Sequence, residues 1–440
     1  MKKSYLFSAF AAGMVMLSAC SSDGDLTGGN AGNESNDAVQ QIVLQVANTG
    51  EGMQTRAGRP LLSSEAKQSI DQVKIIICDN ATGNKNNVLY VKTINNWQDV
   101  SSTYNEGGHG RKKTIQLTGN NKLGKGDYTI YAFGYEATTE TKSSDYNDLN
   151  DNIVNVSVGA KFNPNTVVTL KDPTKSKGEE IFAGSYTLKL SADNLGFDKP
   201  VVLNRQVAGT FGYFDNIPYV DGAAKLQLVA SNGNANLVLG GFNSFDLTGN
   251  GKGNGTNVNY VVNGTNAATD NVVYTIKLQD WFTNVKDDNT DGLIDADTNW
   301  KGDAKKYAKG SVFGGTFLIP FAKVDSKKTF VLQLTDDAGK VLKEWTVKLP
   351  SGDGQLSAYS FFKWNGTTFE NTPKVQDTQD KYSVVRNHLY GIGERALDNP
   401  TNPGNPDPTN PDKPEPLNKK QELTLHVNDN WEVIHKMELE

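Results

Sequence analysis

Apolar and polar residues alternate along several short stretches of this chain, the pattern of β-strands that bury one face. The stretches 41–46, 127–133, 186–190 and 329–334 follow it, and the apolar run 73–78 indicates a further strand. Turn-forming residues separate these stretches, and no part of the body sustains a long helical period. We therefore expect an all-β protein with few, short helices.

The order of the predicted strands indicates β-sandwiches. Residues 329–335 and 340–349 predict a hairpin whose turn is Asp-Asp-Ala-Gly at 336–339. Many short strands separated by turns are typical of sandwiches, and the body of the chain is long for a single one. We expect two sandwiches in series, over residues 57–217 and 218–398.

The N-terminus has the features of a lipoprotein signal peptide. Lys2 and Lys3 precede an apolar stretch, residues 6–17, that is too short to span a bilayer as a helix. Small residues then lead to a cysteine in Leu17-Ser18-Ala19-Cys20. We expect residues 1–19 to be removed and Cys20 to carry acyl chains; an ordinary secretory signal with a chance cysteine is the alternative. Residues 21–36 are rich in Ser, Gly, Asn and Asp, which indicates a flexible tether.

Composition and charge narrow the class of protein further. The 440 residues include 43 glycines and many Asn, Asp and Thr, which favours turns over helices. The net charge of −6, without a basic block, argues against a nucleic-acid partner. If Cys20 carries lipid, Cys78 is left alone, so no internal disulfide forms and the cores must hold by packing.

The C-terminus combines a spacer with a long alternating strand. Residues 399–416 hold seven of the chain's 15 prolines, which predicts an extended spacer over 399–420. Residues 421–440 then alternate, broken at Asp429 and His435, with apolar side chains at Leu423, Leu425, Val427, Trp431, Val433, Met437 and Leu439. This strand could fold back onto its own domain, or it could complete a sheet in a neighbouring molecule. The long spacer favours the second interpretation, a detached donor strand.

A matching feature lies near the N-terminus. If residues 41–46 fill a groove in the first sandwich, a cut in the exposed Gly/Arg loop that follows would release that strand and leave the groove empty. Arg56-Ala57 is a suitable site for a trypsin-like protease, whereas proline after Arg59 blocks cleavage there. We therefore interpret residues 20–56 as a tether and removable propeptide strand; a plain surface linker is the alternative.

Four short motifs resemble the fimbrillin superfamily of Bacteroidia, whose members build type V pili. They are EEIFAG at 179–184, LNRQVAG at 203–209, YSVVRNHLY at 382–390 and NWEV at 430–433. Taken with Leu17-Ser18-Ala19-Cys20 and Thr55-Arg56-Ala57, the resemblance covers most of the chain, and the Pro/Asp-rich spacer is most similar to that of the minor-type shaft fimbrillins.

The resemblance implies two transthyretin-like β-sandwiches and a structural role as the shaft subunit of a pilus for adhesion and colonisation. It implies a lipid-anchored precursor at the outer membrane and cleavage after Arg56 by a trypsin-like surface protease. Strand exchange would then build an extracellular fibre of copies of this chain with anchor and tip subunits. In that scheme Cys20 is the lipid site, Arg56 and Ala57 flank the cut, and residues 421–440 are the donor strand.

An acidic loop is the one candidate metal site. Asp287, Asn289, Asp291 and Asp295 stand at positions 1, 3, 5 and 9 of a calcium-loop pattern, with glycine at the sharp turn. The acid expected at position 12 is replaced by Thr298, and no helices flank the loop. A structural calcium ion and a solvated Asp/Asn turn are both open, and no cofactor is required.

Enzyme chemistry is not indicated. The histidines 109, 388, 426 and 435 lack metal-ligand spacing, and no helix pattern follows the glycine-rich stretch 249–255, which argues against a phosphate loop. The main alternative is a non-polymerising, glycan-binding surface lipoprotein that stacks sugars on Trp97, Trp281, Trp300 or Trp364.

Overall fold

The computed structural model describes most of the chain from Gln40 to Asn428. The described ranges are 40–46, 70–103, 111–136, 144–172, 177–191, 196–197, 199–240, 261–268, 271–304, 307–350, 361–394, 398–399, 402–406, 413–419 and 421–428.

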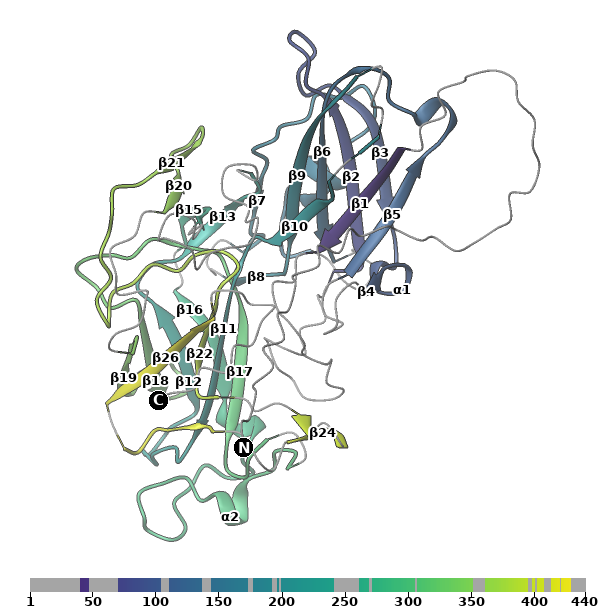
Figure 1. Ribbon diagram of the computed structural model, residues 1–440. Coiled ribbons are helices and arrows are strands. Elements are labelled where there is room, and N and C mark those ends of the chain that lie inside the picture. The colour runs from purple at the N-terminus through teal and green to yellow at the C-terminus, as the bar shows by residue number, and fades with distance from the viewer. Residues whose placement is uncertain are drawn as a thin grey trace, which may run out of the picture. The chain divides into compact units, whose positions relative to one another are not determined.

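The first half of the chain forms an eight-stranded sheet in the order β3-β2-β6-β9-β10-β1-β5-β4 (Figure 1). Its strands are β1 (Gln40–Val46), β2 (Gln72–Asp79), β3 (Val88–Ile94), β4 (Ser102–Thr103), β5 (Arg111–Leu117), β6 (Gly126–Tyr135), β9 (Phe182–Leu190) and β10 (Val201–Arg205). Side chains of β2 and β6 share one core with those of β5 and β10. The sheet therefore curls until its two ends face each other across that core.

The second half forms a larger sheet in the order β16-β12-β18-β19-β26-β22-β11-β17-β8, with β25 paired to β11. Its strands are β8 (Lys177–Gly178), β11 (Ala208–Asp215), β12 (Lys225–Ala230), β16 (Val272–Lys277), β17 (Val312–Leu318), β18 (Phe330–Thr335), β19 (Val341–Lys348), β22 (Leu389–Ile392), β25 (Glu415–Pro416) and β26 (Glu422–Asn428). One core joins the apolar side chains of β12 and β18 to those of β22 and β26.

Three small sheets complete the strand set. They are β15 (Gly264–Ala267), β13 (Asn234–Val238) and β7 (Val167–Thr169); β14 (Val261–Val262), β20 (Phe362–Trp364) and β21 (Phe369–Asn371); and the pair β23 (Asp398–Asn399) and β24 (Asn402–Pro406). Apart from the two-residue β8, which joins the second large sheet, the chain passes from the first large sheet to the second between Arg205 and Ala208; the sequence placed the boundary at 217/218.

Helices are short in the described part of the chain. They are α1 (Trp97–Val100), α2 (Ala296–Asn299) and the turns η1 (Gly119–Asn121), η2 (Asn150–Val154) and η3 (Leu278–Asp280). None of these described helices has the length and apolarity needed to cross a membrane. The predicted all-β class is confirmed, as are the strand in each quoted stretch and the β18–β19 hairpin.

The continuous apolar run of β2 has a physical explanation. Alternate side chains of a strand point to opposite faces, and both faces of β2 are covered. Ile75 and Ile77 enter the core shared with β5, while Ile76 and Cys78 enter a second core that includes Leu237 and Ile319. Because each face is buried, the strand needs no polar alternation.

Candidate functional site at the two terminal strands

β1 lies inside the first sheet rather than at its edge. It pairs antiparallel with β5 along its whole length and parallel with β10 from Leu44 to Val46 (Figure 1). Its inward side chains Ile42 and Leu44 are 1% and 0% exposed, and Ile42 stands opposite Ile115 of β5. The first sheet is therefore continuous only while β1 is present, since β5 otherwise pairs only with the two-residue β4.

A polar side chain fixes the register of this strand. The Gln40 Nε2 donates to the carbonyl oxygen of Leu123, and the Leu123 N–H donates to the Gln40 Oε1, each at 2.7 Å. Gln40 is 1% exposed, so these bonds satisfy polar groups that water does not reach. A shift of one residue would break both bonds and turn Ile42 and Leu44 away from the core.

Removal of β1 would open an apolar groove. The walls would be β5 and β10, each with one row of backbone groups left without a partner. The side chains that line it would include Ile115 and Leu117 of β5 and Val201 and Leu203 of β10, which are at most 5% exposed while β1 is in place. Such a groove accepts an extended segment with alternate apolar side chains.

β26 occupies the corresponding kind of position in the second sheet. It runs parallel to β19, from the pair Thr346–Glu422, and antiparallel to β22, through the pair Ile392–Leu425. Leu423 and Leu425 are each 1% exposed in the core of the second large sheet. Both terminal strands thus lie between one parallel and one antiparallel neighbour.

The expectation of a detached C-terminal strand is wrong for residues 422–428. This segment lies in its own domain because β19 and β22 leave a strand-wide opening above an apolar core, which Leu423 and Leu425 fill. The residues before it are also attached: the indole Nε1 of Trp345 donates to the Leu417 carbonyl at 3.1 Å, and Lys413 pairs with Glu394 at 3.1 Å. This segment folds back onto its own domain, which is the other interpretation of the sequence.

Several predicted site residues lie outside the described residues. These are Cys20, Arg56, Ala57, Trp431, Val433, Met437 and Leu439. The backbone of Val427 pairs with Tyr390. Sequence reasoning missed Gln40, because a polar residue at the start of an apolar strand gives no signal of a buried partner 83 residues away.

Three of the four short motifs meet where the chain passes from the first sheet to the second. The Arg205 Nε contacts the Glu180 Oε1 at 2.6 Å, with both side chains 1% exposed. The Arg386 Nη1 donates to the Gln206 Oε1 at 2.8 Å, and the Gly209 N–H donates to the carbonyl of His388 at 2.9 Å. These motifs therefore build a buried polar junction between β10 and β11.

The acidic loop is held by its own hydrogen bonds. The carboxylate of Asp287 accepts the N–H groups of Asp291 and Gly292, at 3.2 and 2.8 Å. Asp295 caps α2 by accepting from the N–H groups of Asp297 and Thr298. Within the described residues, no group of three or more His, Cys, Asp or Glu side chains is placed to hold a metal ion.

The four tryptophans proposed as sugar platforms have different surroundings. Trp97 is fully buried in the core of the first large sheet, and Trp281 and Trp300 pack against the core of the second large sheet. Trp364 lines a pocket.

Comparisons with known proteins give structural neighbours only. No known protein family matches the chain, and no curated protein matches it. The tip fimbrial protein Mfa3 from Porphyromonas gingivalis aligns at 11% identity over 80% of this chain and 94% of its own, with a TM-score of 0.32. The fimbrial anchor protein Mfa2 from the same organism aligns at 11% identity over 79% and 99%, with a TM-score of 0.32. A fimbrial assembly protein from Parabacteroides distasonis aligns at 10% identity over 81% and 92%, with a TM-score of 0.34.

These neighbours are fimbrial proteins of Bacteroidia and not enzymes. The function proposed for this chain rests on its two terminal strands.

Proposed function

We propose that this protein is a structural subunit of a pilus shaft that polymerises by strand exchange. In the proposed cycle, Cys20 anchors the precursor to the outer membrane through lipid, and a trypsin-like surface protease cuts between Arg56 and Ala57. β1 then leaves the first sheet, and residues 421–440 of a neighbouring copy take its place. Anchor and tip subunits would end the fibre.

One observation carries the proposal: the two terminal segments have the same pattern. Residues 40–46 read QQIVLQV and residues 421–427 read QELTLHV. At alternate positions the first gives Gln40, Ile42, Leu44 and Val46, and the second gives Gln, Leu, Leu and Val. Because alternate side chains of a strand share a face, the second segment can present the same order of one polar and three apolar side chains to the groove of the first domain.

The matched pattern defines a register for the exchange. With Leu423 and Leu425 in the places of Ile42 and Leu44, Gln421 takes the place of Gln40 beside the backbone of Leu123. Gln421 is exposed in its own domain, so it is not needed for the folded monomer. In the neighbour it would restore the two hydrogen bonds that Gln40 makes.

The filament follows from the geometry of donation. A donor strand at one end and an acceptor groove at the other form a head-to-tail contact that does not close on itself, which gives fibres rather than dimers. Before cleavage β1 fills the groove, and β26 lies in its own sheet, so the precursor stays monomeric. Exchange therefore requires that β1 leaves the first sheet and that β26 leaves the second. Cleavage after Arg56 would release β1, which makes proteolysis the trigger of assembly.

Limited proteolysis tests the proposal. The arginines of the chain are Arg56, Arg59, Arg111, Arg205, Arg386 and Arg395. Arg205 and Arg386 are buried, and proline follows Arg59. An arginine-specific protease added to protein 21–440 should cut after Arg56 and produce ladders on a native gel and fibres in electron micrographs.

Variants separate cleavage from exchange. Arg56→Ala should remain an uncut monomer. Gln421→Ala should be cut normally and keep its melting temperature, yet assemble at least several-fold more slowly. Asn418→Ala, at an exposed position just before β26, is the control and should assemble at the normal rate. Stable cut monomers, together with no effect of deleting residues 421–440, would refute the proposal.

A further inference from the structure

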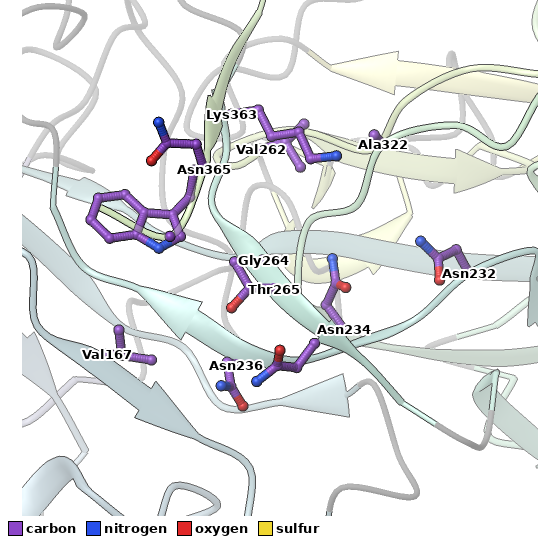
Figure 2. Close-up of a pocket in the computed structure, with 13 residues that line it drawn as sticks. Val167, Asn232, Asn234, Asn236, Val262, Gly264, Thr265, Ala322, Lys363 and Asn365 are labelled. Carbon is purple, nitrogen blue, oxygen red and sulfur yellow. The ribbon is translucent and has the colours of Figure 1, made fainter. Parts of the chain in front are cut away.

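A pocket separate from both terminal strands lies between two of the small sheets. Its volume is about 510 Å³, within the range of roughly 300–1,000 Å³ that is typical of small-molecule sites. Strands β13 and β15 supply one side, and β14 and β20 supply the other. Figure 2 shows Lys363 and Asn365 across the pocket from Asn234 and Asn236, with Gly264 and Thr265 between them.

The lining is unusually rich in side-chain amides. Five of its 13 residues are asparagines: Asn232, Asn234, Asn236, Asn266 and Asn365. The first three stand at alternate positions of one segment, so they share a face. An amide both donates and accepts hydrogen bonds, which matches a hydroxyl group, itself a donor and an acceptor.

Several of these polar groups are unused within the described part of the chain. The side chains of Asn236, Thr265 and Lys363 make no hydrogen bond or ion pair with described residues. Asn234 is different: its Nδ2 donates to the carbonyl of Pro320 at 2.7 Å, which holds the amide in place. Asn232 and Asn365 also make hydrogen bonds of their own. The pocket therefore combines amides that the protein holds in place with the amide of Asn236, the hydroxyl of Thr265 and the ammonium group of Lys363, which are available to a ligand.

Glycine at 264 is required for this wall of the pocket. A Cβ atom added at Gly264 would lie 2.0 Å from the Pro320 carbonyl oxygen and 2.7 Å from the Asn234 Nδ2. Any side chain at 264 would displace the fixed amide. The close approach of β15 to Asn234 thus depends on a residue without a Cβ.

Trp364 supplies an aromatic surface beside the amides. It is half-buried, and its ring meets Phe369 edge-on at 5.2 Å between centroids. The turn after it is fixed because the Asn365 Oδ1 accepts the N–H groups of Thr367 and Thr368, and Gly366 has a φ of +106°. Apolar C–H faces of a sugar ring stack on such an indole while its hydroxyls bind amides.

The charges of the lining argue against metal ions and other cations. It contains no carboxylate and one lysine, so it suits neither a metal ion nor a cationic ligand. One lysine on a chain of net charge −6 is also a weak basis for nucleic acid. We infer that the pocket formed by Asn234, Asn236, Thr265 and Trp364 binds a neutral carbohydrate of one or two rings.

This site would add a binding function to the structural one. It involves neither β1 nor β26, so it exists in the monomer and would be repeated in every subunit of a fibre. Weak single sites in such an array give strong attachment to a glycan-coated surface, because the second binding event becomes intramolecular. Its presence can be tested whether or not the protein polymerises.

The test uses uncut protein 21–440 and saturation-transfer NMR, followed by calorimetric titration. The probes are lactose, maltose, cellobiose, mannobiose and diacetylchitobiose, with 3′-sialyllactose as the charged comparator and glycerol as the simple polyol. We expect at least one neutral disaccharide to bind saturably. Asn236→Ala and Thr265→Val should each weaken the affinity for this disaccharide by about tenfold or more. Asn84→Ala, which replaces an exposed asparagine of the β2–β3 turn, should leave the affinity unchanged.

Trp364→Ala should also abolish binding. Because Trp364 packs on Phe369, this substitution could unfold the protein, so the melting temperature of the variant must be compared with that of the parent protein. The two smaller substitutions keep the inference testable if that variant unfolds. No saturable binding of any neutral disaccharide, binding of sialyllactose alone, or full binding by both Asn236→Ala and Thr265→Val would overturn it.

Discussion

Gln40 and Leu123 are joined by two hydrogen bonds of 2.7 Å, one from each residue to the other, in a place that water does not reach. The pair connects the first residue of β1 to the segment that precedes β6. It therefore ties β1 to the rest of the first domain at a single register.

We predict that Gln40→Ala lowers the free energy of unfolding by about 1–3 kcal/mol, because the N–H and carbonyl of Leu123 lose buried partners. Urea denaturation of protein 21–440 measures this change. Gln41→Ala is the matched control: Gln41 is exposed on the other face of the strand, and its replacement should change stability by less than about 0.5 kcal/mol. Equal effects of the two substitutions would contradict the assigned register.

The sequence predicted which segments form strands better than it predicted which strands pair with one another. The alternation in residues 41–46 and the apolar run in 73–78 depend on local periodicity, and both strands are present. The place of β26 could not be predicted in this way, because the same alternation suits any groove with an apolar floor. The amide pocket was missed for a related reason: Asn232, Asn234 and Asn236 resemble a polar loop until strands distant in sequence surround them.

The buried pair of Glu180 and Arg205 should matter far more than exposed ion pairs. Both side chains are 1% exposed, so Glu180→Ala leaves a guanidinium in the interior without its carboxylate. We predict a loss of about 3–5 kcal/mol in the free energy of unfolding. In the control pair, Lys189 and Asp127 are 82% and 44% exposed, and Asp127→Ala should cost less than about 1 kcal/mol. Chemical denaturation of both variants decides; a Glu180→Ala protein as stable as Asp127→Ala would count against a structural role for this junction.

Cys78 should be inert in the folded protein. Its side chain is fully buried, and burial raises the pKa of the thiol to about 12, so the reactive thiolate is absent at pH 8. We predict that protein 21–440 reacts with a thiol reagent such as DTNB only after denaturant is added. Because the thiol of the unfolded chain ionises with its ordinary pKa of 9.0, the contribution of Cys78 to stability is constant below that pH and falls above it. Fast labelling of the native protein would show that this core opens.

The acidic loop should keep its shape without calcium. Asp287 and Asp295 already accept backbone N–H groups, so the turn does not depend on an ion to orient its carboxylates. We predict that dialysis against EDTA leaves the melting temperature unchanged, whereas Asp287→Ala lowers it in either buffer. A rise of several degrees on addition of calcium, lost in Asp287→Asn, would instead establish a structural calcium site.

A disulfide that locks β26 in its own sheet tests whether β26 must leave that sheet before fibres assemble. Lys348 and Thr424 are register partners on adjacent parallel strands. Neighbouring strands lie about 4.8 Å apart, within the Cα separations that a disulfide spans. We predict that oxidised Lys348→Cys/Thr424→Cys protein is cut after Arg56 but stays monomeric, and that a reductant restores assembly.

The control lock, Gln333→Cys/Glu344→Cys, joins β18 to β19 and leaves both terminal strands free, so this variant should assemble whether oxidised or reduced. Normal fibres from the oxidised first variant would limit the donor to residues beyond 428, because β26 would then remain in its own domain throughout assembly.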